Sequence, residues 1–252
     1  MNRIRIIPIL LLKNGGLYKT VKYKNPVYIG DPINTVKIFN EKEADELIIL
    51  GFNTSLNKSQ IDFKKITEIA GEAFMPMSYG GGIQSFEDAK MIFDAGYEKV
   101  ILNSILFSKT NIVHKIANIY GRQSVVGSID VKRNIFGNYR VYSHSGTKRT
   151  NYDPAKWAKI LEENGVGEII VSTIDKDGTW SGYDEAMINI ISDAVSVPVI
   201  ASCGAANTDD FTKAVNAGAS AVAAGSMFVY QKKNMGVLIS FPTNYTLFNT
   251  KE

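Results

Sequence analysis

The sequence predicts an α/β fold, a single (β/α)8 TIM barrel built from two similar half-barrels. Three observations predict it. Apolar segments alternate with amphipathic segments along the 252 residues. Many apolar segments are almost continuous, which is typical of parallel strands buried on both faces. A stretch of the first half also recurs in the second half at a constant offset of 122 residues, and such repeats indicate an architecture built from repeated units.

The expected strands and helices follow one another in strict alternation. An eight-stranded barrel with its helices typically takes about 250 residues, and an open doubly wound sheet is the alternative. Capping residues such as Ser85 and Thr208 precede several helices, and glycines follow several others. We expect strands at 5–12, 47–51, 75–79, 99–103, 124–130, 168–173, 198–202 and 220–224, and helices at 31–40, 61–73, 86–94, 111–120, 154–164, 185–193 and 208–216.

The internal repeat favours the closed barrel over the open sheet. It predicts one domain over residues 1–252, with half-barrels of about 1–122 and 123–230. We expect a short or irregular tail over 231–252, because glycine, proline and β-branched residues make a long helix poor there. The offset superimposes Pro76 on Pro198, Gly82 on Gly204, Asp88 on Asp210, Gly96 on Gly218 and Ser104 on Ser226.

The composition restricts the class of protein. The single cysteine, Cys203, excludes an internal disulfide and a cysteine-based zinc cluster, and it favours a cytoplasmic location. A net charge of +3 does not indicate nucleic-acid or membrane partners. His114 and His144 show no metal-ligand spacing, so we expect no metal and no cofactor.

Glycine-rich turns follow the strands in both halves. In a barrel these turns lie at the carboxyl ends of the strands, where ligands bind. Glycine lets the backbone approach an anion closely, and helix N-termini add N–H groups. Matched turns on one rim predict a ligand with two phosphates or two anionic ends; ordinary tight turns are the alternative. The turns are Gly80–Gly82, Asn103–Ser104, Asp177–Thr179, Cys203–Gly204 and Gly225–Ser226.

Three further side chains belong to the same rim. Asp130 ends the fifth strand, where a carboxylate can act as a general acid or base. Asp177 is a second carboxylate candidate, or the cap of the turn that follows it. Lys19 lies in a long loop at 13–30 that could close over an anionic substrate; a solvated basic loop is the alternative.

A set of charged residues marks the opposite end of the barrel. Arg5, Glu46, Lys99 and Glu168 stand where the first, second, fourth and sixth strands begin. Their spacing alone favours scattered salt bridges of little energetic value.

Several segments match one known family in order and spacing. The segments IDVKR at 129–133, STIDKDGTWSGYD at 172–184, YGGGI at 79–83, GYEKVILNS at 96–104 and ASCGAA at 201–206 resemble the cyclase subunit of imidazole glycerol phosphate synthase, the HisF family, nearly end to end. The resemblance implies a cyclase of the lyase class and a HisH-like glutaminase partner that forms a heterodimer at the bottom of the barrel. It also implies that ammonia passes up through the barrel to a phosphorylated substrate.

The resemblance also implies roles for individual residues. Asp130 would be one catalytic acid, and Arg5, Glu46, Lys99 and Glu168 would form the gate of the ammonia channel. The phosphates would be held by Gly82, Asn103, Ser104, Gly178, Gly204, Gly225 and Ser226.

Two departures from the family pattern concern its acids. Leu11 stands where the first catalytic aspartate is expected, and Gly51 replaces an acid on the second strand. The segment LLLKNGG and the tail resemble a divergent branch that is associated with amidation of bacterial surface-polysaccharide sugars, in which a separate sugar amidotransferase uses the ammonia. Three hypotheses remain: ammonia delivery for a sugar, an orthodox cyclase of histidine biosynthesis that uses another acid such as Asp177, and a non-catalytic barrel that only activates the glutaminase.

Overall fold

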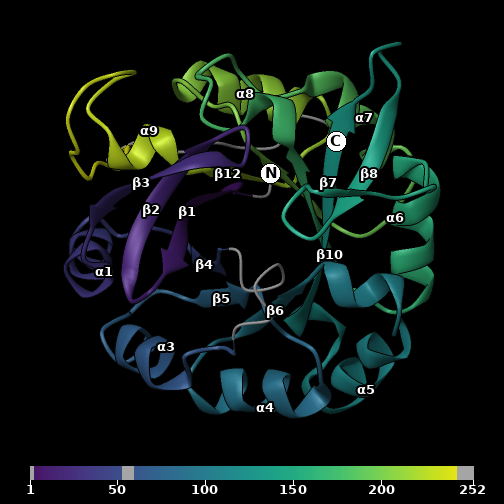
Figure 1. Cartoon of the computed structure of the whole chain (residues 1–252), viewed down its shortest axis with the longest axis horizontal. Helices are drawn as coiled ribbons and strands as arrows, with labels where there is room; N and C mark the ends of the chain where they lie inside the picture. The colour runs from purple at the N-terminus through teal and green to yellow at the C-terminus, as the bar shows by residue number, and fades with distance from the viewer. Residues whose placement is uncertain (1–2, 53–59, 243–252) are drawn as a thin grey trace.

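The computed structural model describes residues 3–52 and 60–242, and it shows a closed barrel of parallel strands inside a ring of helices (Figure 1). Eight strands form the barrel, and pairing of β12 with β1 and of β10 with β7 closes it. The predicted (β/α)8 barrel is confirmed, and the open sheet is wrong. The barrel strands are β1 (Arg5–Lys13), β4 (Leu47–Gly51), β5 (Met77–Gly80), β6 (Lys99–Leu102), β7 (Val125–Arg133), β10 (Glu168–Thr173), β11 (Val199–Ser202) and β12 (Ala221–Ala224).

Six of the eight helices in the described ranges begin at a side chain that accepts a backbone N–H group, whereas α5 and α9 begin without such a cap. Ser85 forms a capping box with Asp88 before α4, as its sequence predicts. Thr208 is not a cap, because the side chain of Asn207 takes that position before α8. The helices are α1 (Pro32–Glu41), α3 (Phe63–Ala70), α4 (Phe86–Asp94), α5 (Asn111–Tyr120), α6 (Pro154–Glu163), α7 (Glu185–Ser192), α8 (Thr208–Asn216) and α9 (Ser226–Val229), with 3-10 turns η1 (Ser104–Phe107), η2 (Arg122–Ser124) and η3 (Ile174–Lys176).

Two antiparallel excursions extend the barrel beyond its rim. The segment 13–30 is not a loop as expected, because β2 (Gly16–Val21) and β3 (Lys24–Gly30) form a hairpin on β1. After β7, the strands β8 (Tyr139–Ser143) and β9 (Lys148–Arg149) do the same.

The two antiparallel excursions occur at equivalent positions of the internal repeat. The turn between β2 and β3 contains Lys22 and Tyr23, and the turn between β8 and β9 contains His144 and Ser145, both at the offset of 122 residues. All four have positive φ, between 52° and 60°. Two such residues in succession are what the tight turn between β2 and β3 requires, whereas the loop between β8 and β9 is longer and spans 144–147.

The core has two layers separated by the barrel wall. Between wall and helices lie large buried side chains such as Phe39, Trp157 and Phe211. Inside the barrel the filling is mainly aliphatic, as expected of a barrel whose interior is packed. The inner set comprises Ile7, Ile9, Ile48, Ile101, Val126, Ile170, Ile200, Ala221 and Ala223.

The end of the chain is irregular within the described residues. After the short α9, an isolated bridge between Tyr230 and Val237 is the next regular pairing. The part of that tail at 243–252 lies outside the described residues. In the part of the chain that the structure covers, no helix has both the length and the apolar character required to cross a bilayer.

The outer core predicts a contrast between two phenylalanines. Phe211 is fully buried and Phe136 is 81% exposed. Because truncation of Phe211 leaves a cavity, Phe211→Ala is expected to lower the free energy of unfolding by about 3–5 kcal/mol. The control, Phe136→Ala, should stay within about 0.5 kcal/mol in the same urea titration. Equal losses would mean that the packing of α8 on the barrel is misassigned.

Candidate active site

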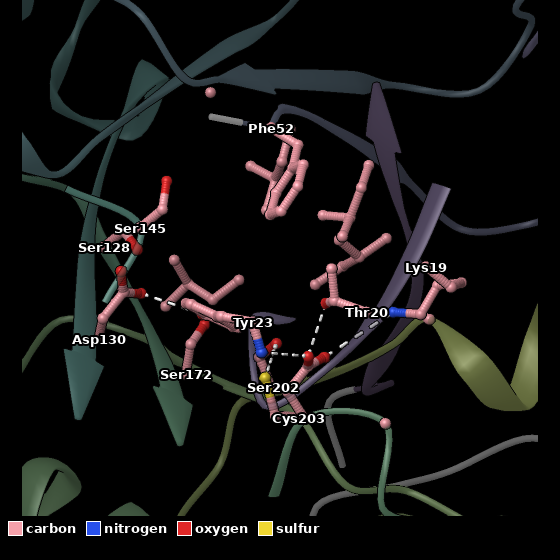
Figure 2. Close-up of a pocket in the computed structure, with 18 of the residues that line it drawn as sticks. Lys19, Thr20, Tyr23, Phe52, Ser128, Asp130, Ser145, Ser172, Ser202 and Cys203 are labelled. Carbon is pink, nitrogen blue, oxygen red and sulfur yellow. Dashed lines mark hydrogen bonds and ion pairs between the residues drawn. The ribbon is translucent and has the colours of Figure 1, made fainter. Parts of the chain in front are cut away.

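The candidate site is a pocket at the carboxyl ends of the barrel strands (Figure 2). Its floor is the upper part of the aliphatic interior, including Ile9, Ile101 and Ile170. Above that floor, polar side chains of β7, β10 and β11 enter the pocket: Ser128, Asp130, Ser172 and Ser202 (Figure 2). The pocket therefore changes from apolar to polar along the barrel axis.

Asp130 is the carboxylate on the β7 wall. It is 7% exposed, and its Oδ1 accepts a hydrogen bond of 3.2 Å from the hydroxyl of Tyr23. Burial raises the pKa of Asp130 to about 7, although the hydrogen bonds from Tyr23 and Asn103 lower it and the charge of Asp177 raises it. A carboxyl group with this pKa can both donate and accept a proton near neutral pH.

Asp177 holds the β2–β3 hairpin. Its Oδ2 accepts a hydrogen bond of 2.7 Å from the hydroxyl of Thr20 and one of 3.0 Å from the backbone N–H of Tyr23. Its backbone carbonyl accepts from the N–H of Lys22 at 2.9 Å. Among the described residues its carboxylate contacts the hairpin rather than the turn that follows it, which corrects the alternative of a turn cap.

Lys19 belongs to β2 of the same hairpin, and its side chain is buried. It is only 6% exposed, and its Nζ lies 3.9 Å from Oδ1 of Asp177. The alternative of a solvated basic loop is therefore wrong for this side chain. Figure 2 shows Lys19 and Thr20 on one side of the pocket, and Tyr23 reaching across it to Asp130.

The wall opposite Asp130 carries no acid from the first two barrel strands. Leu11 of β1 and Gly51 of β4 line the pocket, together with Leu50 and Phe52. Since neither leucine nor glycine can exchange a proton, the pocket has an acidic side and an apolar side.

Most of the residues expected to bind phosphate come together in this pocket. Gly82 does not line the pocket; Gly80 and Gly81 line it instead. The Oδ1 atom of Asn103 is buried without a hydrogen-bond partner within the described residues, so it can accept from a ligand. The expected residues that line the pocket are Asn103, Ser104, Gly178, Gly204, Gly225 and Ser226.

Two of these glycines make room for the hairpin in the structure. A Cβ on Gly178 would lie 2.4 Å from the carbonyl oxygen of Thr20, and one on Gly225 would lie 2.5 Å from Nζ of Lys19. At Gly178 the lack of a side chain lets the hairpin backbone dock closely, whereas at Gly225 the neighbouring atom is the end of the flexible Lys19 side chain.

The four charged residues at the opposite end form a closed ring. Lys99 Nζ lies 3.1 Å from Glu46 Oε2 and 2.9 Å from Glu168 Oε2, and Arg5 forms ion pairs with both glutamates. Ser78 donates a further hydrogen bond of 2.7 Å to Glu46. Burial alone would raise the pKa of Glu46, but Lys99 and Arg5 outweigh it and lower that pKa. The expectation of scattered salt bridges is wrong.

Comparison with known proteins identifies the family. The family described as "Histidine biosynthesis protein" matches residues 5–234, so the chain belongs to it. A Pseudomonas aeruginosa protein, provisionally named an imidazole glycerol phosphate synthase subunit of the hisF type, is 48% identical over 243 residues, 96% of this chain and 97% of that protein.

Two other relatives carry similar names. A Leptospira interrogans protein, also provisionally named an imidazole glycerol phosphate synthase subunit HisF, is 42% identical over 244 residues, which is 96% of each chain. A Streptomyces griseus protein named imidazole glycerol phosphate synthase subunit HisF is 37% identical over 225 residues, 89% of this chain and 90% of that one.

Tyr23 and Ser145 are pocket residues that the sequence analysis missed. A signal for the antiparallel turn from β1 to β2 is present in Asn14–Gly15, since this pair favours a tight hairpin turn and both residues have positive φ. Tyr23 lies in the next turn, between β2 and β3. The internal offset then relates Tyr23 to Ser145.

The raised pKa of Asp130 predicts a pH-dependent gain in stability on neutralisation. Between pH 4 and pH 7 the carboxyl group of Asp130 is protonated in the folded protein but ionised in the unfolded chain. The free energy of unfolding therefore falls as the pH rises towards the folded-state pKa of about 7. Asp130→Asn should therefore raise the free energy of unfolding by up to about 4 kcal/mol at pH 8 and by less than about 1 kcal/mol at pH 4. The exposed Asp209→Asn is the control in denaturant titrations at both pH values. An equal effect of Asp130→Asn at pH 4 and pH 8 would contradict the assignment.

The docking of the hairpin predicts a difference between two glycines. Gly178 and Gly137 have φ values of +67° and +78°, so alanine strains both backbones, but only at Gly178 would the Cβ meet other atoms. Gly178→Ala is expected to increase hydrogen exchange over residues 16–30 by at least about tenfold, as expected for loss of about 1.4 kcal/mol of local stability. Unchanged protection relative to Gly137→Ala would show that the hairpin docks without this close approach.

Proposed function

We propose that this chain is the HisF-like synthase subunit of a glutamine amidotransferase complex. In this proposal a HisH-like glutaminase docks at the bottom of the barrel, and ammonia passes through the barrel to an acceptor at the rim. The observation that carries the proposal is the closed ring of Arg5, Glu46, Lys99 and Glu168 beneath an aliphatic interior that leads to the pocket.

The chemistry of the interior suits ammonia. A neutral molecule of this size loses much less solvation free energy in an aliphatic layer than a cation without a partner does, because the desolvation of an unpaired charge is far more costly. The ring supplies ion pairs that can exchange partners at the entrance, and Lys99 contacts both glutamates. The names of the relatives, which are synthase subunits, agree with a partner-dependent enzyme.

The pocket supports delivery to a separate acceptor rather than cyclisation in the barrel. Leu11 and Gly51 leave Asp130 without an opposing acid from β1 or β4. Loss of one general acid or base typically costs about 10²–10⁴-fold in rate. We therefore propose amidation of a bacterial surface-polysaccharide sugar, with a sugar amidotransferase as the further partner.

An orthodox cyclase of histidine biosynthesis is the second candidate. Asp130 with a pKa of about 7 and Asp177 in the same pocket favour it, because two carboxyl groups could share the proton transfers. This requires Asp177 to exchange its contacts with Thr20 and Tyr23 for contacts with the substrate.

Replacement of Lys99 tests ammonia passage. In the complex with the glutaminase, Lys99→Met removes one cation of the ring, so we expect glutamine hydrolysis to continue while ammonia incorporation falls by at least about tenfold. Lys99→Arg should restore part of the coupling, and the exposed Lys90→Met is the control. If folded Lys99→Met still incorporated ammonia in proportion to glutamine hydrolysis, ammonia passage through the ring would be contradicted. The barrel would then retain only a role in activating the glutaminase.

Leu11 separates the two catalytic candidates. Purified barrel supplied with an ammonium salt and the bis-phosphorylated cyclase substrate should show negligible cyclisation. Leu11→Asp should raise that rate by about 10²-fold or more if the lost acid is the missing element. Robust turnover by the unmodified barrel would reject delivery to a separate sugar acceptor and favour the orthodox cyclase.

A further inference from the structure

A second cavity lies outside the candidate active site, beside the β8–β9 hairpin. Its volume is 490 Å³, within the range of small-molecule sites. It shares Ser104 with the main pocket, and the turn that carries His144 and Ser145 separates the two, because His144 lines this cavity and Ser145 lines the main pocket. We call it the hairpin groove. It is lined by Ser104, Phe107, Ser108, Ser143, His144, Lys148, Arg149, Thr150, Asn151 and Tyr152.

The lining carries an excess of positive charge. Lys148 and Arg149 are adjacent and exposed, and neither forms an ion pair with any residue in the described ranges. The lining contains no acidic residue. Two adjacent cations without carboxylate partners favour an anion, and the guanidinium of arginine matches the geometry of a phosphate.

The other side of the groove is aromatic and fixed in place. Trp157 is 1% exposed, and the ring of Phe107 stacks on it at 4.4 Å between centroids and 9° between planes. Tyr152 packs against Trp157 at 4.4 Å and remains 40% exposed. An exposed ring held by a buried one can stack with a planar base at small entropic cost.

Polar groups of the turn complete the lining. The backbone N–H of His144 donates to Ser104 Oγ at 2.9 Å, and Nδ1 of its ring lies 2.9 Å from Ser143 Oγ. These contacts fix the turn between the groove and the main pocket. The groove thus combines unpaired cations, hydroxyl groups and an exposed aromatic ring.

We propose that the hairpin groove binds a nucleoside diphosphate, with the phosphates at Lys148 and Arg149 and the base against Tyr152. The proposal needs neither ammonia passage nor cyclisation, so it stands or fails separately from the proposed function. Pyrophosphate alone would use only the cationic part of the groove, and a nucleoside alone would use only the aromatic part.

Residue-specific protection of lysines tests the proposal on the full chain. Acylation of Lys148 would be followed by peptide mass spectrometry with UDP, ADP, pyrophosphate or uridine present, and Lys156 and Lys159 on α6 serve as internal references. We expect UDP or ADP to slow acylation of Lys148 by roughly fivefold to tenfold, more than pyrophosphate or uridine does, without protecting the references. No protection of Lys148, or equal protection of the references, would overturn the proposal. Equal protection by pyrophosphate would overturn the assignment of the base to Tyr152.

Calorimetry with paired variants excludes binding in the main pocket. Lys148→Ala with Arg149→Ala should weaken the groove's affinity for UDP by about tenfold or more, and Lys156→Ala with Lys159→Ala should leave it unchanged, because only the first pair lines the groove. Any UDP bound in the main pocket contributes equally to both. Tyr152→Leu should remove the preference for UDP over pyrophosphate. Identical isotherms for the two double variants would place the nucleotide elsewhere and end the proposal.

Discussion

Closure of the barrel through the pairings of β12 with β1 and of β7 with β10 is the constraint on which the rest depends. Parallel pairing without a free edge brings the carboxyl ends of all eight strands to one rim and their amino ends to the other. Asp130 and Asp177, which are 47 positions apart in the sequence, thereby line one pocket. The same closure brings Arg5, Glu46, Lys99 and Glu168 within ion-pair distance at the opposite end.

The pocket differs from one wall to the other, and this difference bears on its chemistry. Asp130 lies among serines and a tyrosine on the β7 side, whereas Leu11, Leu50 and Phe52 form the facing side. A substrate that required proton transfer on two opposite faces would meet a carboxyl group on only one of these two walls. A nucleophile that only needs to be kept unprotonated and out of water finds apolar surroundings on the other.

The barrel elements could be predicted from the sequence because the strands are largely apolar runs and most of the helices begin at a capping side chain. The strand expected at 47–51 has those bounds, and the helix expected at 61–73 spans Phe63–Ala70 after its Asp62 cap. The hairpins could not be predicted in the same way, since β2 and β3 contain glycine, lysine and proline and pair antiparallel outside the barrel. The sequence therefore predicts a loop at Lys19, while the burial of its side chain depends on contacts across the chain with Asp177.

Site residues were predictable where glycine or a carboxylate ended a strand, and not where a hairpin supplied them. Tyr23 belongs to a turn with positive φ, and tyrosine is not a residue that such turns favour, so its position above Asp130 has no local signal. Gly178 was noticed for its lack of a side chain, but the atoms that approach it belong to Thr20 and Val21. Which group approaches a glycine is decided by the tertiary fold, and a single sequence does not record it.

The equivalent turns at Lys22–Tyr23 and His144–Ser145 break the symmetry of the repeat they come from. Both pairs have positive φ, although the loop between β2 and β3 spans 22–23 and the loop between β8 and β9 spans 144–147. Tyr23 brings a large phenol to the pocket lining, and Ser145 brings a small hydroxymethyl group. A molecule with two similar ends would therefore meet two different surfaces at these two turns. The duplicated scaffold is thus asymmetric at the pocket, because its two equivalent turns contribute side chains of different size.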